Sequence, residues 1–124
     1  MIYLDTHVVV WLYGGELGLL SETARREIEL NRLLISPAVE LESEFLYEIG
    51  RIKTGARKIT DFLKERIGLE KCTISFDRVV RSSMAVKWTR DPFDRLIVGQ
   101  AALQSSSLLT NDEVIRSNYS QSVW

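Results

Sequence analysis

Residues 90–102 read RDPFDRLIVGQAA and combine a predicted helix start with two carboxylates. Asp91 suits the N-cap, Pro92 suits the first helical turn, and Asp94 lies where an acid interacts favourably with the helix dipole. Apolar residues then recur at helical spacing, at Phe93, Leu96, Ile97 and Ala101. Because such a helix packs against a core, Asp94 is expected at the edge of the protein interior. Helix capping alone would also explain both acids.

Two further acids follow predicted buried strands. Asp5 ends the apolar run at 1–4, and Asp112 comes shortly after a short apolar strand predicted at 107–109. A carboxylate directly beyond a buried strand lies at the end of a sheet, where ligand sites of parallel sheets are found.

The fifth acid of interest, Glu42, lies on a helix predicted over 38–52. At the +3 position from Val39 it points with the buried face, whereas Glu40, Glu44 and Glu48 have better access to water. Leu46 and Ile49 extend the stripe of Val39, and Leu41, Phe45 and Ile52 form the stripe beside it. An unpaired buried carboxylate costs several kcal/mol, so Glu42 is neutralised, bound to a cation or paired with an arginine.

Strands and helices alternate along the chain. Strands are predicted at 1–4, 33–35, 69–76 and 107–109, with an edge strand at 122–124; helices are predicted at 21–31, 38–52, 59–67, 78–88 and after residue 91, with a short helical turn at 8–13. This alternation predicts an α/β fold: a three-layer α/β/α sandwich with a short, mainly parallel sheet. Without a linker or repeat, residues 1–124 form a single predicted domain.

Composition narrows the class of protein. The chain has 124 residues, of which 45% are hydrophobic and 27% charged, as in soluble globular domains. Its one cysteine, Cys72, excludes an intrachain disulfide and fits an inert buried thiol, and no Cys/His cluster indicates zinc. No signal peptide or membrane span is evident, so a cytoplasmic location is expected.

Charge is unevenly distributed although the net charge is only −1. Residues 1–50 contain three basic and nine acidic side chains, and residues 51–95 contain twelve basic and six acidic ones. An acidic cluster beside a basic segment suits a metal-dependent site that acts on a polyanion, although solvated helix faces would give the same count.

The acids Asp5, Glu42, Asp94 and Asp112 are expected to meet at one edge of the sheet. Such a cluster is stable when a divalent cation compensates its charge, and an oxygen-only ligand set favours Mg²⁺ or Mn²⁺ over zinc. Magnesium leaves coordination positions open to phosphate oxygens and activates a bound water for in-line attack. The predicted reaction is phosphodiester hydrolysis.

Nearly the whole chain resembles PIN-domain proteins of the VapC-like toxin group. The matching segments are LDTHVVVWL at 4–12, ISPAVELESEFLYEIGRI at 35–52, DPFDRLIVGQA at 91–101, LLTNDEVIRSNY at 108–119 and Trp124. The resemblance implies a PIN-like fold and an Mg²⁺- or Mn²⁺-dependent endoribonuclease, often homodimeric, that is inhibited by an antitoxin protein encoded beside it. The implied RNA hydrolysis uses a metal-activated water.

Carried over by position, the resemblance assigns Asp5, Glu42, Asp94 and Asp112 as catalytic metal ligands. Asp91 is the second acid of the DPFD motif, and whether it contacts metal stays open. Thr6 and Thr110 match hydroxyl positions that orient a carboxylate or a water.

Several residues have two interpretations. His7, the only histidine, suits a loop or helix start and is not required as a general base. Arg95 is a candidate phosphate ligand, with pairing to Asp91 or Glu42 as the alternative. The aromatic side chains of Trp88, Phe45 and Tyr47 would stack on bases or, more commonly, pack in the core or a dimer interface.

An alternative function is a non-catalytic PIN-fold module that binds a metal ion, RNA or a basic partner peptide. Two other classes fit poorly. A phosphoaspartyl hydrolase of the haloacid-dehalogenase type requires an acid where this chain has His7, and a response-regulator receiver requires a lysine near the end of the last strand, where this chain has none.

Overall fold

The computed structural model describes all residues, 1–124, as five short strands and seven α-helices. The strands are β1 (Ile2–Leu4), β2 (Leu33–Ile35), β3 (Glu70–Lys71), β4 (Ser107–Leu109) and β5 (Ser122–Val123). The helices are α1 (Thr6–Tyr13), α2 (Glu22–Leu30), α3 (Pro37–Glu48), α4 (Ala56–Ile67), α5 (Phe76–Ser83), α6 (Pro92–Leu103) and α7 (Glu113–Asn118), and a 3₁₀ turn, η1, spans Leu17–Leu19.

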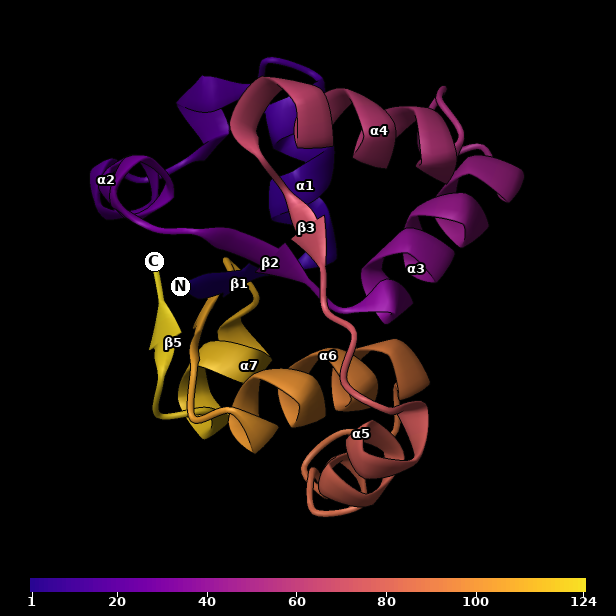
Figure 1. The fold of residues 1–124 in the computed structure, drawn as a ribbon, viewed down its shortest axis with the longest axis vertical. Coiled ribbons are helices and arrows are strands. Elements are labelled where there is room, and N and C mark those ends of the chain that lie inside the picture. Colours follow the sequence, from indigo (N-terminus) through magenta and orange to yellow (C-terminus); the bar gives the residue numbers. More distant parts are fainter.

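The strands form one parallel sheet in the order β3-β2-β1-β4-β5. Helices α1 to α4 cover one face, and α5 to α7 cover the other (Figure 1). The α/β class, the parallel sheet and the three layers predicted from the sequence are thereby confirmed. Because the chain leaves central β1 toward β2 and later returns to β4 on its other side, the carboxyl end of β1 is the point where ligand sites of such sheets form.

The core fills the space on both sides of the sheet. All three residues of β1 are fully buried, as are Ile35 of β2 and Leu108 and Leu109 of β4. They pack against Val8 and Val9 of α1 and Ile97 and Ala101 of α6. Uninterrupted apolar strands are typical of a sheet covered on both faces, and they hold the carboxyl ends of the strands in fixed positions.

The strand predicted at 69–76 is wrong in length, since only Glu70 and Lys71 pair with β2. The alternation of Cys72, Ile74 and Phe76 suggested a longer strand. However, β2 ends at Ile35, whose carbonyl accepts the last ladder bond from the Cys72 amide at 2.9 Å. Pro37 then starts α3, so residues beyond Cys72 have no partner strand.

The helix predicted at 78–88 is shifted and shortened to α5. Ser75, not Asp77, is its N-cap and accepts a hydrogen bond from the Arg78 amide at 3.4 Å. The helix ends at Ser83, where the Arg95 guanidinium donates to the carbonyl oxygens of Ser83 and Met84, each at 3.3 Å. In a longer helix these two carbonyl oxygens would accept hydrogen bonds from backbone amides of the next turn, and here the guanidinium replaces those donors.

The helix predicted at 38–52 ends earlier, at Glu48, and both of its predicted apolar stripes are only partly covered. Leu41 and Phe45 of one stripe and Ile49 of the other keep 63%, 45% and 51% of their surface exposed, because these positions form a side of α3 over which no element packs. Ile52, by contrast, packs against the core. Glu40 and Glu44 are half-buried instead of freely solvated, since they accept hydrogen bonds from Thr60 and from the amide of Ala56.

Other predicted boundaries agree within a few residues. The Ser21-capped helix at 21–31 corresponds to α2, and the strands at 33–35 and 107–109 are confirmed. The helix at 59–67 begins three residues earlier, at Ala56, and ends before Gly68, whose φ of +69° suits glycine. None of the helices is long and apolar enough to cross a bilayer.

Candidate metal centre

Three of the five predicted acids are N-caps. Asp5 begins α1, Asp91 begins α6 and Asp112 begins α7. The Asp91 side chain accepts a hydrogen bond from the Asp94 amide at 3.1 Å, and the Asp112 side chain accepts one from the Ile115 amide at 2.9 Å. The capping interpretation is therefore correct for Asp91, and the same role, not predicted for Asp5 and Asp112, fixes where all three carboxylates point.

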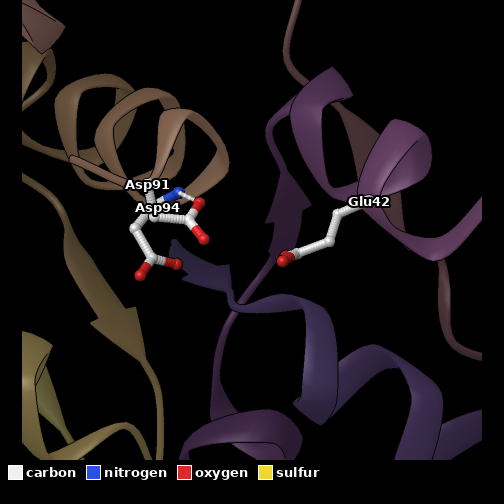
Figure 2. A group of neighbouring side chains, drawn as sticks. All are labelled: Glu42, Asp91 and Asp94. Atoms are coloured by element: carbon white, nitrogen blue, oxygen red, sulfur yellow. Dashed lines mark hydrogen bonds between the residues drawn. The ribbon is translucent and has the colours of Figure 1, made fainter. Parts of the chain in front are cut away.

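Glu42, Asp91 and Asp94 form a carboxylate cluster. One oxygen atom from each side chain lies within 4.8 Å of the other two. Figure 2 shows Glu42 extending from α3 toward the two aspartates at the start of α6. Oxygens that lie about 2.0–2.1 Å from one Mg²⁺ are at most about 4.2 Å apart, so these side chains need to approach one another by only a few tenths of an ångström to share a cation.

Asp5 and Asp112 lie beside this cluster and are linked to each other through Thr110. The Asp5 carboxylate is 6% exposed, and it accepts hydrogen bonds from the Thr110 hydroxyl at 2.6 Å and from the Thr6 amide at 2.8 Å. The Thr110 hydroxyl oxygen in turn accepts from the Asp112 amide at 3.0 Å. These bonds hold the two acids at the carboxyl ends of β1 and β4.

Thr6 joins the two groups of acids. Its amide donates to Asp5, and its hydroxyl donates to Glu42. Both threonines, which the family resemblance pointed to, thus contact carboxylates of the candidate site. Thr6 and Thr110 are fully buried, so their hydroxyl groups are held in place by packing.

Burial and neighbouring acids raise the pKa of Asp5, Glu42 and Asp94. Burial and the negative charges of Asp91, Asp5, Glu42 and Asp112 raise the pKa of Asp94 from 3.8 to about 7. Burial is also the main cause of the raised pKa of Glu42 and of Asp5, which the hydrogen bonds from the threonines partly oppose. Because Asp94 interacts with all four other acids, it is the electrostatic centre of the site.

No basic side chain forms an ion pair with these acids, although the nearby charge of His7 lowers the pKa of Asp5 and of Glu42 to a minor extent. The four ion pairs of the protein join Arg26 to Glu22, Arg32 to Glu70, Lys71 to Glu40 and Arg81 to Asp77. The arginine partner considered for Glu42 is therefore absent, and the guanidinium of Arg95 is bound to backbone carbonyls instead of to Asp91 or Glu42. A role for Arg95 in binding phosphate stays a prediction.

The donor set fits a hard divalent cation. Only carboxylate oxygens converge at the cluster, without histidine or cysteine, and their charges are otherwise uncompensated. Such a set favours Mg²⁺ or Mn²⁺. Glu42, Asp91 and Asp94 are the closest candidate ligands, so the structure brings Asp91 into the cluster more directly than the sequence pattern indicated.

A small cavity of about 160 Å³ lies next to Asp5 and Asp112, and it is also lined by His7, Trp11 and Asn111. His7 is the second residue of α1, as the helix-start interpretation predicts, and its ring lies 6.0 Å from that of Trp11. No sequence pattern pointed to Trp11 or Asn111 as site residues. Trp11 lies within an apolar run that predicts only a buried segment. Asn111 lies between Thr110 and Asp112, and this polar stretch after a strand is the signal that could have pointed to it.

The aromatic residues differ in exposure. Trp88 is half-buried and packs against the core, as expected. Phe45 and Tyr47 each keep 45% of their surface exposed and are not core residues. The ring of Phe45 lies 6.0 Å from the ring of Phe93, a residue that stands between the two acids of the DPFD motif in the sequence.

The PIN domain family model matches residues 2–119. The chain therefore belongs to the PIN domain family. The resemblance inferred from the sequence segments is confirmed at the level of the family. No curated protein sequence matches this PIN-domain chain significantly.

Solved structures with similar folds belong to toxin–antitoxin complexes. A toxin–antitoxin complex from Klebsiella pneumoniae matches with a TM-score of 0.68 at 15% identity, over 100% of this chain and 97% of that one. VapBC2 from Rickettsia felis, bound to a promoter DNA fragment, matches with a TM-score of 0.66 at 19% identity, over 94% and 92% of the two chains. VapBC-1 from nontypeable Haemophilus influenzae matches with a TM-score of 0.54 at 16% identity, over 94% of each chain. At these identities, the similarity concerns the fold of the PIN domain.

Proposed function

We propose that this PIN-domain protein is an Mg²⁺- or Mn²⁺-dependent endoribonuclease that hydrolyses RNA phosphodiester bonds. The observation that carries the proposal is the cluster of Glu42, Asp91 and Asp94, whose oxygen atoms lie within 4.8 Å of one another without a basic partner. When bound there, the metal would polarise the phosphate and lower the pKa of a water for in-line attack.

The roles of the chain's own residues follow from their contacts. Glu42, Asp91 and Asp94 would hold the cation, and Asp5 and Asp112 would complete its surroundings. The hydroxyl groups of Thr6 and Thr110 hold the carboxylates of Glu42 and Asp5 in place by hydrogen bonds. A metal ligand that is already oriented loses less entropy when the metal binds. The proposed catalytic set is Asp5, Glu42, Asp94 and Asp112, with Asp91 as a further metal ligand.

Exposed basic side chains that flank the acids in sequence support a polyanionic substrate. Arg51 and Lys53 follow α3, and Lys87 and Arg90 precede α6; all four are exposed and form no ion pair. Since α3 carries Glu42 and α6 begins at Asp91, these bases flank the acids along the chain. They would contact phosphates on either side of the cleaved bond.

A cleavage assay tests this proposal. The chain is incubated with a fluorescently labelled single-stranded RNA in the presence of Mg²⁺, Mn²⁺ or EDTA. Glu42→Gln and Asp94→Asn should each lower the cleavage rate by about 100-fold, as loss of a metal ligand does. Glu48→Gln is the matched control, because Glu48 is an exposed acid on the same helix.

Two results would contradict the nuclease. Cleavage that persists in both variants would point to a contaminating enzyme. Intact RNA with every metal, together with binding of Mn²⁺ or of a basic peptide, would favour the non-catalytic PIN module instead.

We further propose that the chain is the toxin of a toxin–antitoxin pair, with an antitoxin protein as its partner and a homodimer as its assembly. Support comes from the full-length fold similarity to toxin–antitoxin complexes. Expression of the chain in a bacterium should arrest growth, and Asp94→Asn should abolish the arrest. Co-expression of the small reading frame beside the gene should restore growth, and sedimentation of the purified chain measures its assembly.

A further inference from the structure

The small cavity beside Asp5 and Asp112 is bordered by side chains to which the proposed chemistry gives no role. These are His7 and Trp11 of α1 and Asn111 of the loop between β4 and α7. The cavity volume of about 160 Å³ is well below the ~300–1,000 Å³ of pockets that enclose drug-sized ligands. The cavity therefore suits a single flat ring system.

The aromatic part of this cavity belongs to a row of three rings. The His7 ring lies 6.0 Å from the Trp11 ring with 50° between their planes, and the Trp11 ring lies 6.0 Å from the Trp124 ring with 58° between their planes. Trp11 also packs against the core, which holds its ring in place, whereas His7 is exposed. Aromatic rings at a nucleic-acid site stack on unpaired bases, because every base has a π face.

Asn111 supplies a free polar group at the same place. Thr110 and Asp112 on either side of it form hydrogen bonds within the chain, but the exposed carboxamide of Asn111 forms none. A carboxamide has an N–H donor beside an acceptor oxygen, and this pair matches N7 and the N6 amino group of adenine. The carboxylates of Asp5 and Asp112 in the cavity also attract an amino group and repel the carbonyl oxygens of uracil.

We propose that this cavity holds one base of the RNA substrate, preferably adenine, which stacks against His7 and Trp11 and pairs with Asn111. Asn111 is thereby the residue that determines base specificity. Asp5 and Asp112 belong to the proposed catalytic set and line the same cavity, so the bound base belongs to a nucleotide next to the cleaved bond. The inference rests on the proposed function for its substrate class and adds which side chains select the sequence.

The test measures binding separately from cleavage. Fluorescently labelled RNA pentamers UUAUU, UUCUU, UUGUU and UUUUU are titrated in Mg²⁺ into the Glu42→Gln variant, and anisotropy reports binding. Gel electrophoresis of the same samples verifies that the RNA is intact, as it is in this variant whether or not the unmodified chain is a nuclease. UUAUU should bind at least about fivefold more tightly than UUUUU, because a bidentate pair to a base discriminates by this much or more.

An exchange of the amide tests the role of Asn111. Asn111→Asp, made in the Glu42→Gln background, replaces the N–H donor by a second acceptor oxygen. It should bind UUGUU more tightly than UUAUU, because guanine presents two N–H donors, N1–H and N2–H, side by side. Asn118→Asp is the matched control, since it adds the same charge at an exposed asparagine of α7, and it should keep the preference for adenine.

Substitution of His7 tests the stacking. His7→Ala in the same background should weaken binding of all four pentamers alike, by about fivefold or more, and His7→Phe should restore it. Because His7 is exposed, its replacement leaves the core packing unchanged. A general loss of affinity separates stacking from the base preference, which Asn111 alone should alter.

The proposal is overturned if no pentamer binds, if all four bind equally, if Asn111→Asp keeps the preference of the chain with Asn111, or if His7→Ala changes no affinity. Failure of the nuclease is distinguishable from failure of the base site. A preference that changes with Asn111 in a chain that never cuts RNA supports the base site and contradicts the nuclease. Metal-dependent cleavage without any base preference does the opposite.

Discussion

Replacing Asp94 by asparagine should stabilise the metal-free protein, and the gain should depend on pH. Asparagine has nearly the same shape as aspartate but carries no charge. Burial and the four neighbouring acids raise the pKa of Asp94 from 3.8 to about 7, so the folded state holds a proton that the unfolded state releases. The folded protein is therefore destabilised as pH rises through this interval.

The magnitude follows from the pKa difference. A shift of about three units corresponds to roughly 4 kcal/mol at and above pH 7, and screening by water at this partly exposed site reduces it to about 2 kcal/mol. At pH 5 the pH is only about one unit above the pKa of Asp94 in the unfolded state. The expected gain is therefore about 1 kcal/mol or less. Below about pH 3 both states are protonated and the gain should disappear.

Urea unfolding in EDTA at pH 4, 5 and 8 measures this gain. Asp61→Asn, which removes an exposed acid of α4, is the control and should change the free energy of unfolding by less than about 0.5 kcal/mol. The reasoning is refuted if Asp94→Asn is no more stable than the unmodified chain at pH 8, or if its gain is the same at every pH.

Three further predictions concern other parts of the site and its scaffold. Mg²⁺ at pH 8 should raise the unfolding temperature of the unmodified chain but not that of Glu42→Gln, and scanning calorimetry measures both; equal shifts would place the cation elsewhere. Thr110→Val should cost about 1–3 kcal/mol in urea unfolding, because the buried Asp5 carboxylate loses a donor, and Thr110→Ser should recover most of it. Gly99→Ala should cost about 2 kcal/mol or more by the same measurement, since its Cβ would lie 2.4 Å from Ser83 Oγ and 2.8 Å from Ser83 Cα; an unchanged stability would mean that α5 and α6 separate easily.

Sequence patterns predicted the features that depend on local chemistry. Asp91 and Ser21 cap helices as expected, because an N-cap needs only its own side chain and the next turn. The parallel sheet, and the position of Asp5 and Asp112 at the carboxyl ends of its strands, follow from the alternation of strands and helices, whereas the order of the strands does not. The family resemblance added Thr6 and Thr110, whose hydrogen bonds to acids from distant segments have no local signature.

The errors occurred where a neighbouring element decides the outcome. The strand predicted at 69–76 stops at Lys71 because β2 offers nothing further to pair with. Leu41 and Phe45 of one predicted stripe and Ile49 of the other are exposed, because periodicity does not reveal whether another element covers a side of a helix.

Three of the acids at the candidate metal centre are also helix N-caps. Because each has two roles, fewer substitutions are tolerated at these positions. Replacing Asp5, Asp91 or Asp112 by alanine would remove a helix cap together with a charge, at a cost of about 1 kcal/mol each. Asparagine and serine can still accept the capping bond. A lineage that abandoned the chemistry while keeping the fold would therefore drift toward asparagine or serine at these positions, leaving a record of the lost acids in its sequence.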